Sequence, residues 1–111
     1  MTEPIPSHVK ELLEKEVEVE LWGQPDQMPR EMLLEKISDK HGLITSKDQI
    51  DEELIKHAPN LEAVSNISVG YDNFDVEVLK KNNIMATHTP YVLDETVADL
   101  IFGIIISTAR R

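Results

Sequence analysis

The chain has 111 residues, of which 41% are hydrophobic and 29% are charged, a composition typical of one globular domain and not of a disordered or fibrous chain. Its 21 acidic residues outnumber its 11 basic ones, and the formal net charge of -10 argues against nucleic acid or an anionic membrane surface as a partner. Cysteine is absent, which excludes disulfides and thiolate metal sites. The first residues do not resemble a signal peptide, and no apolar run approaches the ~20 residues of a membrane span, so we expect a cytoplasmic protein.

The first part of the sequence predicts a helix, a strand and a second helix. Ser7 is suited to cap a short helix that continues to about Glu16. Residues 17–22 alternate between apolar and mostly acidic side chains, which predicts a half-exposed strand at the edge of a sheet. Pro29 is typical of the first turn of the helix that follows.

The remaining sequence alternates between short apolar runs and helical patterns. Predicted strands cover residues 42–46, 61–66 and 84–87, and the first two are followed by segments with helical spacing. A long helix over residues 92–109 follows the last strand, and apolar side chains cover much more than one of its faces. We expect this helix to be buried by more than a single sheet or to form half of an oligomer interface.

Repeated strand and helix alternation with short connections predicts an α/β fold with a mainly parallel sheet and helices on both faces. Ligands of such folds bind at the carboxyl ends of the strands, so the loops after Ser46, Asn66 and Thr87 are the candidate binding loops.

The loop after Asn66 is the one in which the sequence indicates chemistry. Gly70 would let a ligand approach the main chain without an intervening Cβ, and neighbouring N–H groups could bind an anion such as a carboxylate. The alternative is a plain strand-to-helix turn with Asp72 or Asn73 as the helix N-cap, and the local pattern alone favours that alternative.

Residues 61–111 carry a longer ordered pattern. A glycine loop ends in Asp-Asn, a helix and a short strand follow, and a Thr-Pro turn then precedes Val97-Ala98-Asp99 in a long apolar helix. This arrangement resembles the N-terminal, substrate-binding domain of the D-isomer-specific 2-hydroxyacid dehydrogenases, and is closest in pattern to the glyoxylate/hydroxypyruvate reductases. Asp99 stands where many members have glutamate, which keeps the charge.

The resemblance implies a flavodoxin-like fold and an NAD(P)-dependent reduction of small 2-keto acids to D-2-hydroxy acids. It implies that the backbone N–H groups of Val69 and Gly70 bind the substrate carboxylate and that Val97 contacts the nicotinamide end of the cofactor. No Gly-x-Gly-x-x-Gly motif is present, so the dinucleotide-binding domain is expected to be absent from residues 1–111. The family's catalytic arginine, acid and histidine belong downstream of Arg111, so this partial substrate-binding domain is expected to be inactive alone and to bind no cofactor tightly.

Further expectations concern assembly and the remaining polar residues. The first, central strand of the family fold is expected to be missing, with only residues 1–4 in its place, and a homodimer through the 92–109 helix is expected. His88 is interpreted as structural or solvent-facing, and no metal site is indicated. A non-catalytic module that binds a small acid or a partner protein remains the alternative function. The sequence specifies neither which 2-keto acid is reduced nor whether NADH or NADPH is preferred.

Overall fold

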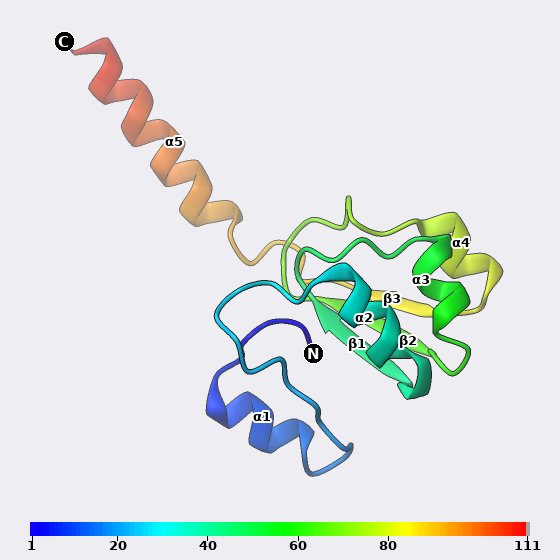
Figure 1. Ribbon diagram of the computed structural model, residues 1–111. Helices are drawn as coiled ribbons and strands as arrows, with labels where there is room; N and C mark the ends of the chain where they lie inside the picture. Colours follow the sequence, from blue (N-terminus) through cyan, green and yellow to red (C-terminus); the bar gives the residue numbers. More distant parts are fainter. Residues whose placement is uncertain (111) are drawn as a thin grey trace.

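The computed structural model describes residues 1–110 and contains a three-stranded parallel sheet with helices arranged around it (Figure 1). The strands are β1 (Gly42–Thr45), β2 (Ala63–Asn66) and β3 (Met85–Thr87), in the order β1-β2-β3. Leu43 pairs with Val64, and Val64 pairs with Ala86. The predicted α/β class with a parallel sheet is confirmed.

Three short helices form one layer against the sheet, with α2 beside α3 and α3 beside α4 (Figure 1). They are α2 (Arg30–Lys36), which continues into the 3-10 turn η1 (Ile37–Asp39), α3 (Glu52–His57) and α4 (Val76–Lys81). Each contributes at least one leucine or isoleucine that is at most 2% exposed and belongs to the hydrophobic core: Leu33, Ile37, Leu54 and Leu79. Burial of such side chains stabilises each helix by roughly 1.5–3 kcal/mol per residue, so packing holds helices that are too short to be stable in isolation.

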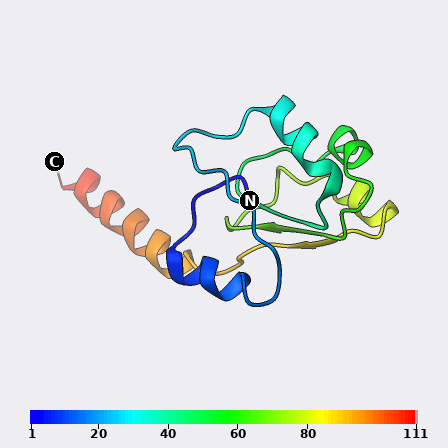
Figure 2. The ribbon, with the colours of Figure 1, turned by 60° about the horizontal axis from the view of Figure 1, so that its bottom comes forward.

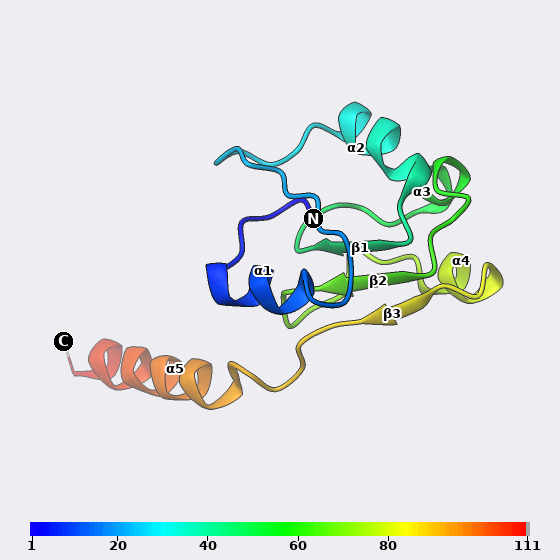
Figure 3. The same ribbon diagram turned by 90° about the horizontal axis from the view of Figure 1, so that it is seen from below.

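The opposite face of the sheet is covered less completely. Helix α1 (Ser7–Leu13) lies on this side, as Figures 1 and 3 show from two directions, and none of its residues is buried. A hollow of about 1060 Å³ extends along this face and the outer edge of β1. It is lined by α1's last residue, the segment after it and small or half-exposed strand residues such as Gly42, Ala63 and Ser65. Helices therefore lie on both faces, but only one face is fully packed.

The first two residues of the chain occupy the position beside β1. The N–H of Thr2 donates to Ile44 O at 3.1 Å, while Met1 accepts from the N–H of Trp22 at 2.9 Å and its α-amino group donates to Glu20 O at 2.7 Å. These bonds to residues 20 and 22 follow the rule of a parallel ladder. Figure 2 shows the N-terminus beside β1 and next to the segment that follows α1. The order of segments, 20–22 then 1–2 then β1, β2 and β3, is the flavodoxin-like order implied by the resemblance.

Burial of the chain terminus has an electrostatic consequence. Burial lowers the pKa of the Met1 α-amino group below 8.0, against an opposing effect of the nearby carboxylate of Glu20. Glu20 itself has its pKa lowered to about 2 by hydrogen bonds from Lys36 and Lys40. The ammonium group is therefore held in a position where its charge is disfavoured.

The prediction of a strand over residues 17–22 was wrong. The described structure has no regular strand there, and Val17 is 56% exposed. Alternating side chains are compatible with an edge strand, but a strand also needs backbone partners. Residues 1–2 provide partners for residues 20 and 22 alone.

Helix α5 (Asp94–Ala109) extends away from the rest of the molecule (Figures 1 and 3). The long apolar helix predicted after the Thr-Pro turn is present, but none of its residues is buried, so the structure shows no protein surface against its apolar faces. Isoleucines 101, 104 and 105 are each more than 50% exposed. Within residues 1–110, no helix is both long enough and apolar enough to cross a membrane.

Candidate functional site

The loop that joins β2 to α4, residues 67–75, is called the glycine loop below. It lies at the carboxyl end of the sheet, where parallel α/β folds bind ligands. Its first residue, Ile67, donates from its N–H to Thr45 O at 2.9 Å, and its last, Asp75, donates to Ile50 O at 2.8 Å. The segment that begins at the end of β1 therefore holds both ends of the glycine loop.

Carbonyl groups inside the glycine loop accept hydrogen bonds from the segment that follows β3. The N–H of Thr89 donates to Ser68 O at 3.3 Å, and Nδ1 of His88 bonds to Val69 O at 2.7 Å. Because a carbonyl oxygen can only accept, Nδ1 of His88 carries the hydrogen in this contact. These bonds fix the orientation of the peptide groups on either side of Val69.

A buried amide holds the next carbonyl. Asn66, at the end of β2 and 1% exposed, donates from Nδ2 to Gly70 O at 2.7 Å and to Asn73 Oδ1 at 2.9 Å. Asn73 in turn donates to Asp48 O at 2.9 Å, and the carboxylate of Asp48 accepts from the hydroxyl of Thr45 at 2.6 Å. Hydrogen bonds in such a low-dielectric setting are strong when they are satisfied, so this network sets the shape of the loop.

Three consecutive N–H groups in the middle of the loop have no acceptor in the part of the chain that the structure describes. Within residues 1–110, the N–H groups of Val69, Gly70 and Tyr71 make no hydrogen bond to a backbone or side-chain atom. The three residues are half-buried or exposed. A run of main-chain donors next to accessible space can bind an anion without a basic side chain. The roles of Val69 and Gly70 in binding a carboxylate stay predictions.

Gly70 is not required by the backbone conformation. No glycine among the described residues has a positive φ angle, and a Cβ added to Gly70 would meet Asp72 Oδ2 at 3.8 Å, an ordinary contact. The protein could therefore accommodate alanine at this position. These contacts do not test the prediction that Gly70 lets a ligand approach the main chain, so it stays a prediction.

The alternative interpretation, a plain turn with Asp72 or Asn73 as the N-cap of the next helix, was wrong about the N-cap residue. Asp75 is the N-cap of α4, and its carboxylate accepts from the N–H of Val78 at 3.1 Å. Asn73 is instead used by the polar network, and Phe74 forms an isolated parallel bridge with Ile50. The glycine loop is consequently tied to the neighbouring segment before α4 begins.

Two contributors to the site carried no specific signal in the sequence. His88, half-buried, was expected to be structural or solvent-facing, and the structure places its ring 5.0 Å from the ring of Tyr71 and in hydrogen-bond contact with Val69. Asn66 was assigned only to the end of a strand. The available signal for Asn66 was a polar side chain at an inward-facing position of a buried strand, which implies hydrogen-bond partners.

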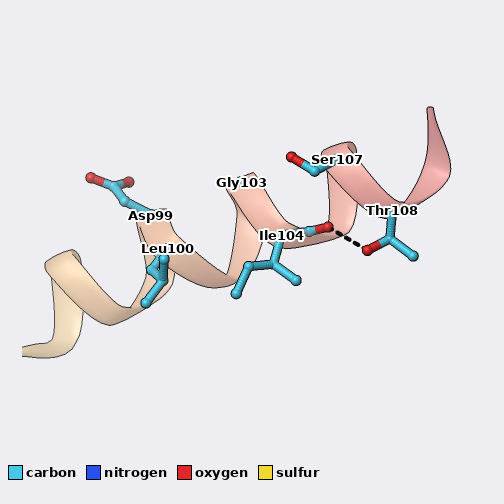
Figure 4. Close-up of a pocket in the computed structure, with 6 residues that line it drawn as sticks. All are labelled: Asp99, Leu100, Gly103, Ile104, Ser107 and Thr108. Atoms are coloured by element: carbon cyan, nitrogen blue, oxygen red, sulfur yellow. Dashed lines mark hydrogen bonds between the residues drawn. The ribbon is translucent and has the colours of Figure 1, made fainter. Parts of the chain in front are cut away.

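Val97 does not join the other candidate residues in a common site. It lies in the first turns of α5, is 46% exposed, and no hydrogen bond links α5 to the glycine loop among the described residues. The hollow of about 590 Å³ on α5 is lined by that helix alone, as Figure 4 shows: Asp99, Leu100, Gly103, Ile104, Ser107 and Thr108. A surface made by one helix is a packing face and not a ligand pocket.

The described residues contain neither a glycine-rich phosphate loop nor a cluster of metal ligands. The four glycines of the chain, at positions 23, 42, 70 and 103, are too far apart for a glycine-rich phosphate loop. Within residues 1–110, no three His, Asp or Glu side chains are arranged to hold a metal. The glycine loop offers main-chain N–H donors that can form hydrogen bonds to an acid.

A parallel α/β domain with main-chain donors at the carboxyl end of its sheet is typical of the small-molecule-binding domains of α/β enzymes. The family model described as the catalytic domain of D-isomer specific 2-hydroxyacid dehydrogenases matches residues 1–107, and the chain belongs to this family.

Curated relatives and solved structures agree with this assignment. The chain is 43% identical to the glyoxylate reductase of Pyrococcus horikoshii over 112 aligned positions, which cover 100% of the chain and 34% of the relative. It is 52% identical to glyoxylate/hydroxypyruvate reductase B of Yersinia pestis over 87 residues, or 78% of the chain and 26% of that protein. The NAD+-bound 3-phosphoglycerate dehydrogenase of Entamoeba histolytica superimposes with a TM-score of 0.75 at 33% identity, over 90% of this chain and 33% of its own. The chain thus spans about a third of the length of the relatives it matches.

Proposed function

We propose that the chain supplies the substrate-carboxylate loop of an NAD(P)-dependent oxidoreductase that reduces glyoxylate, hydroxypyruvate or a similar 2-keto acid to the D-2-hydroxy acid. The observation that carries the proposal is the state of the glycine loop. Its carbonyls at Ser68, Val69 and Gly70 are hydrogen-bonded within the protein, whereas the N–H groups of Val69 and Gly70 have no acceptor among residues 1–110. The names of the curated relatives support the choice of substrate.

The chemistry of a small 2-keto acid suits such a loop. Its carboxylate has two oxygens that accept hydrogen bonds, and charge-assisted bonds of this kind are roughly twice as strong as neutral ones. The chain as a whole carries a net charge of -10, which repels anions at long range. Fixed main-chain donors at close range offset that repulsion without a cationic side chain, so the loop can select the carboxylate end of the substrate.

Reduction itself requires groups from outside this chain. The resemblance assigns hydride transfer to the nicotinamide, and it places an arginine that orients the substrate, an acid and a proton-transferring histidine downstream of Arg111. In that complete enzyme Val97 would contact the cofactor. We propose that residues 1–111 alone neither bind NAD(P) tightly nor catalyse reduction. Their proposed contribution is to hold the acid.

We further propose that α5 and the turn before it, residues 92–109, pair with a second copy of the chain. Large apolar side chains on several sides of this helix are exposed: Val97, Leu100, Ile101, Phe102, Ile104, Ile105 and Ile106. Contiguous apolar surface of this kind is rare on monomeric proteins and marks interaction surfaces. An Ile105→Glu variant should be monomeric at concentrations where the unmodified chain sediments as a dimer; a monomeric unmodified chain would refute this pairing.

The test of the carboxylate site is a titration of the 15N-labelled chain with glyoxylate, followed by the amide signals of Val69 and Gly70. Those signals should shift and saturate, and glycolaldehyde, which lacks the carboxylate, should not reproduce the shift. A titration with NADH should give no saturable binding. Shifts confined to other parts of the chain would refute the site, and tight binding of NADH would refute the absence of a cofactor site.

Gly70→Ala sharpens the test because the new methyl group has room in the protein but stands where a ligand would approach. It should leave the melting temperature nearly unchanged and weaken glyoxylate binding at least about tenfold, the effect of a steric block together with a lengthened hydrogen bond. Gly23→Ala is the matched control, since a Cβ there would meet nothing within 4 Å. Equal affinity of the two variants would contradict the assignment of Gly70.

A further inference from the structure

The ring of His88 contacts the glycine loop on both sides of Gly70. Its Nδ1–H donates to Val69 O at 2.7 Å, and the ring lies 5.0 Å from the ring of Tyr71 at an interplanar angle of 57°. One contact thus precedes Gly70 in the chain and the other follows it. Because His88 contacts the loop at two points, it restricts the orientation of the backbone between Val69 and Tyr71.

The hydrogen bond is made to the peptide group that contains the proposed binding donor. Val69 O and the N–H of Gly70 belong to the same amide. A hydrogen bond to the oxygen of an amide polarises it and strengthens its N–H as a donor, by about 10–30%. The N–H of Gly70 has no acceptor in the part of the chain that the structure describes. The histidine therefore acts on that donor through the amide and needs no contact with the ligand.

The segment that carries His88 is itself fixed against β2 and the loop. On one side of it, the hydroxyl of Thr87 donates to Ser65 Oγ at 3.0 Å, and on the other the N–H of Thr89 donates to Ser68 O at 3.3 Å. The imidazole is half-buried. Its donor is therefore directed at Val69 O before any ligand arrives, and the orientation costs little entropy on binding.

We infer that His88 is a positioning residue for carboxylate recognition, which holds the Val69–Gly70 amide in place and strengthens its N–H as a donor to the acid. The inference rests on the proposed function, because it gives this histidine a part in binding the same carboxylate. Its ring orients and polarises the amide, and no proton transfer to substrate is assigned to it.

Two substitutions of His88 separate the hydrogen bond from the volume of the side chain. His88→Leu keeps an apolar side chain of similar reach and removes the donor, whereas His88→Asn places its Nδ2 close to the position of the imidazole Nδ1 and can donate to the same carbonyl. His57→Leu is the matched control, since Nδ1 of His57 also contacts a backbone oxygen, Glu53 O at 2.9 Å, far along the chain from the glycine loop.

The first measurement is made on the full chain without ligand. The amide 15N shift of Gly70 and the carbonyl 13C shift of Val69 report the hydrogen bond to that amide. Both should move in His88→Leu, return most of the way in His88→Asn and remain unchanged in His57→Leu. Unmoved shifts in His88→Leu would overturn the inference, whether or not the acid binds.

The second measurement is the affinity for glyoxylate. It should fall about 3- to 10-fold in His88→Leu, the effect of one neutral hydrogen bond, and recover to within about twofold in His88→Asn. If the unmodified chain binds glyoxylate at the glycine loop and His88→Leu binds equally well, the inference fails while the proposed function stands. If the unmodified chain shows no shift at the loop up to high millimolar glyoxylate, the proposed function fails and the spectra of the free variants decide the role of His88. If His88→Leu fails to fold, His88→Asn is compared with the unmodified chain. Amide shifts at Gly70 and Val69, or a glyoxylate affinity, that do not return to near the values of the unmodified chain would then overturn the inference.

Discussion

Replacement of Asn66 by alanine should destabilise the chain and loosen the glycine loop together. The side chain is 1% exposed and donates to Gly70 O at 2.7 Å and to Asn73 Oδ1 at 2.9 Å. Each hydrogen bond contributes about 1 kcal/mol net, and the acceptor left unpaired on Asn73 adds about 1 kcal/mol or more. Removal of Asn66 Oδ1, which is buried without a partner among residues 1–110, returns about 1 kcal/mol. The free energy of unfolding should fall by about 2 kcal/mol.

Urea denaturation measures that fall directly, and thermal melting should show a midpoint lowered by roughly 8–15 °C. Ser68→Ala is the matched control, because the Ser68 hydroxyl donates to the same Gly70 O but at 3.3 Å and from a more exposed position. Its effect should stay within about 0.5 kcal/mol. A loss under about 0.5 kcal/mol for the Asn66 variant, or equal losses for the two variants, would refute the view that the buried amide sets the loop.

Three further predictions follow from the backbone and the chain terminus. Tyr91, with a φ of 66°, should gain about 0.5–1 kcal/mol of stability on replacement by glycine, and Asn83, with a φ of 56°, should gain less because asparagine tolerates this conformation; urea denaturation compares the two. Since burial lowers the pKa of the Met1 α-amino group, the unfolded chain binds more protons between that lowered pKa and 8.0, so the free energy of unfolding should rise with pH in this window, and N-acetylation should abolish the rise. A short apolar extension before Met1 should raise the melting temperature by pairing with the N–H of Ile44 and the backbone of Gly42, whereas a proline-rich extension should not.

Local sequence patterns were sufficient for the layer of helices and strands that packs around the core. Leu33, Leu54 and Leu79 occupy the buried positions that helical spacing indicated, and the strands ending at Thr45 and Asn66 lie where short apolar runs placed them. Helical spacing and short apolar runs both indicate which side of an element is buried. That information is carried by residues that are close together in the sequence. Where burial decided the structure, the sequence predicted it well.

Patterns were insufficient where a partner distant in sequence decides the outcome. Residues 17–22 alternate like a strand, yet only residues 20 and 22 find backbone partners, and those come from the chain terminus. The same holds for the site. The glycine loop could be located by the order of strand and helix, but the contact from His88 to Val69 spans 19 residues, and no periodicity indicates a bond of that range. A side chain that orients an amide leaves no local signature.

The groups that hold the glycine loop all lie within residues 45–89, so the proposed binding of a carboxylate does not depend on the two least packed parts of the molecule, which are α5 and the segment that follows α1. Asn66, Asn73 and His88 are fixed by the packed face of the sheet and by β3. Helix α5 and the segment that follows α1 make no hydrogen bond to these three residues. Local stability can differ greatly within one fold, and low stability in one region need not loosen another. Loss of a partner surface on α5 should therefore alter assembly and leave the Gly70 amide unchanged. For this reason the proposed binding of an acid can be tested separately from assembly and from catalysis.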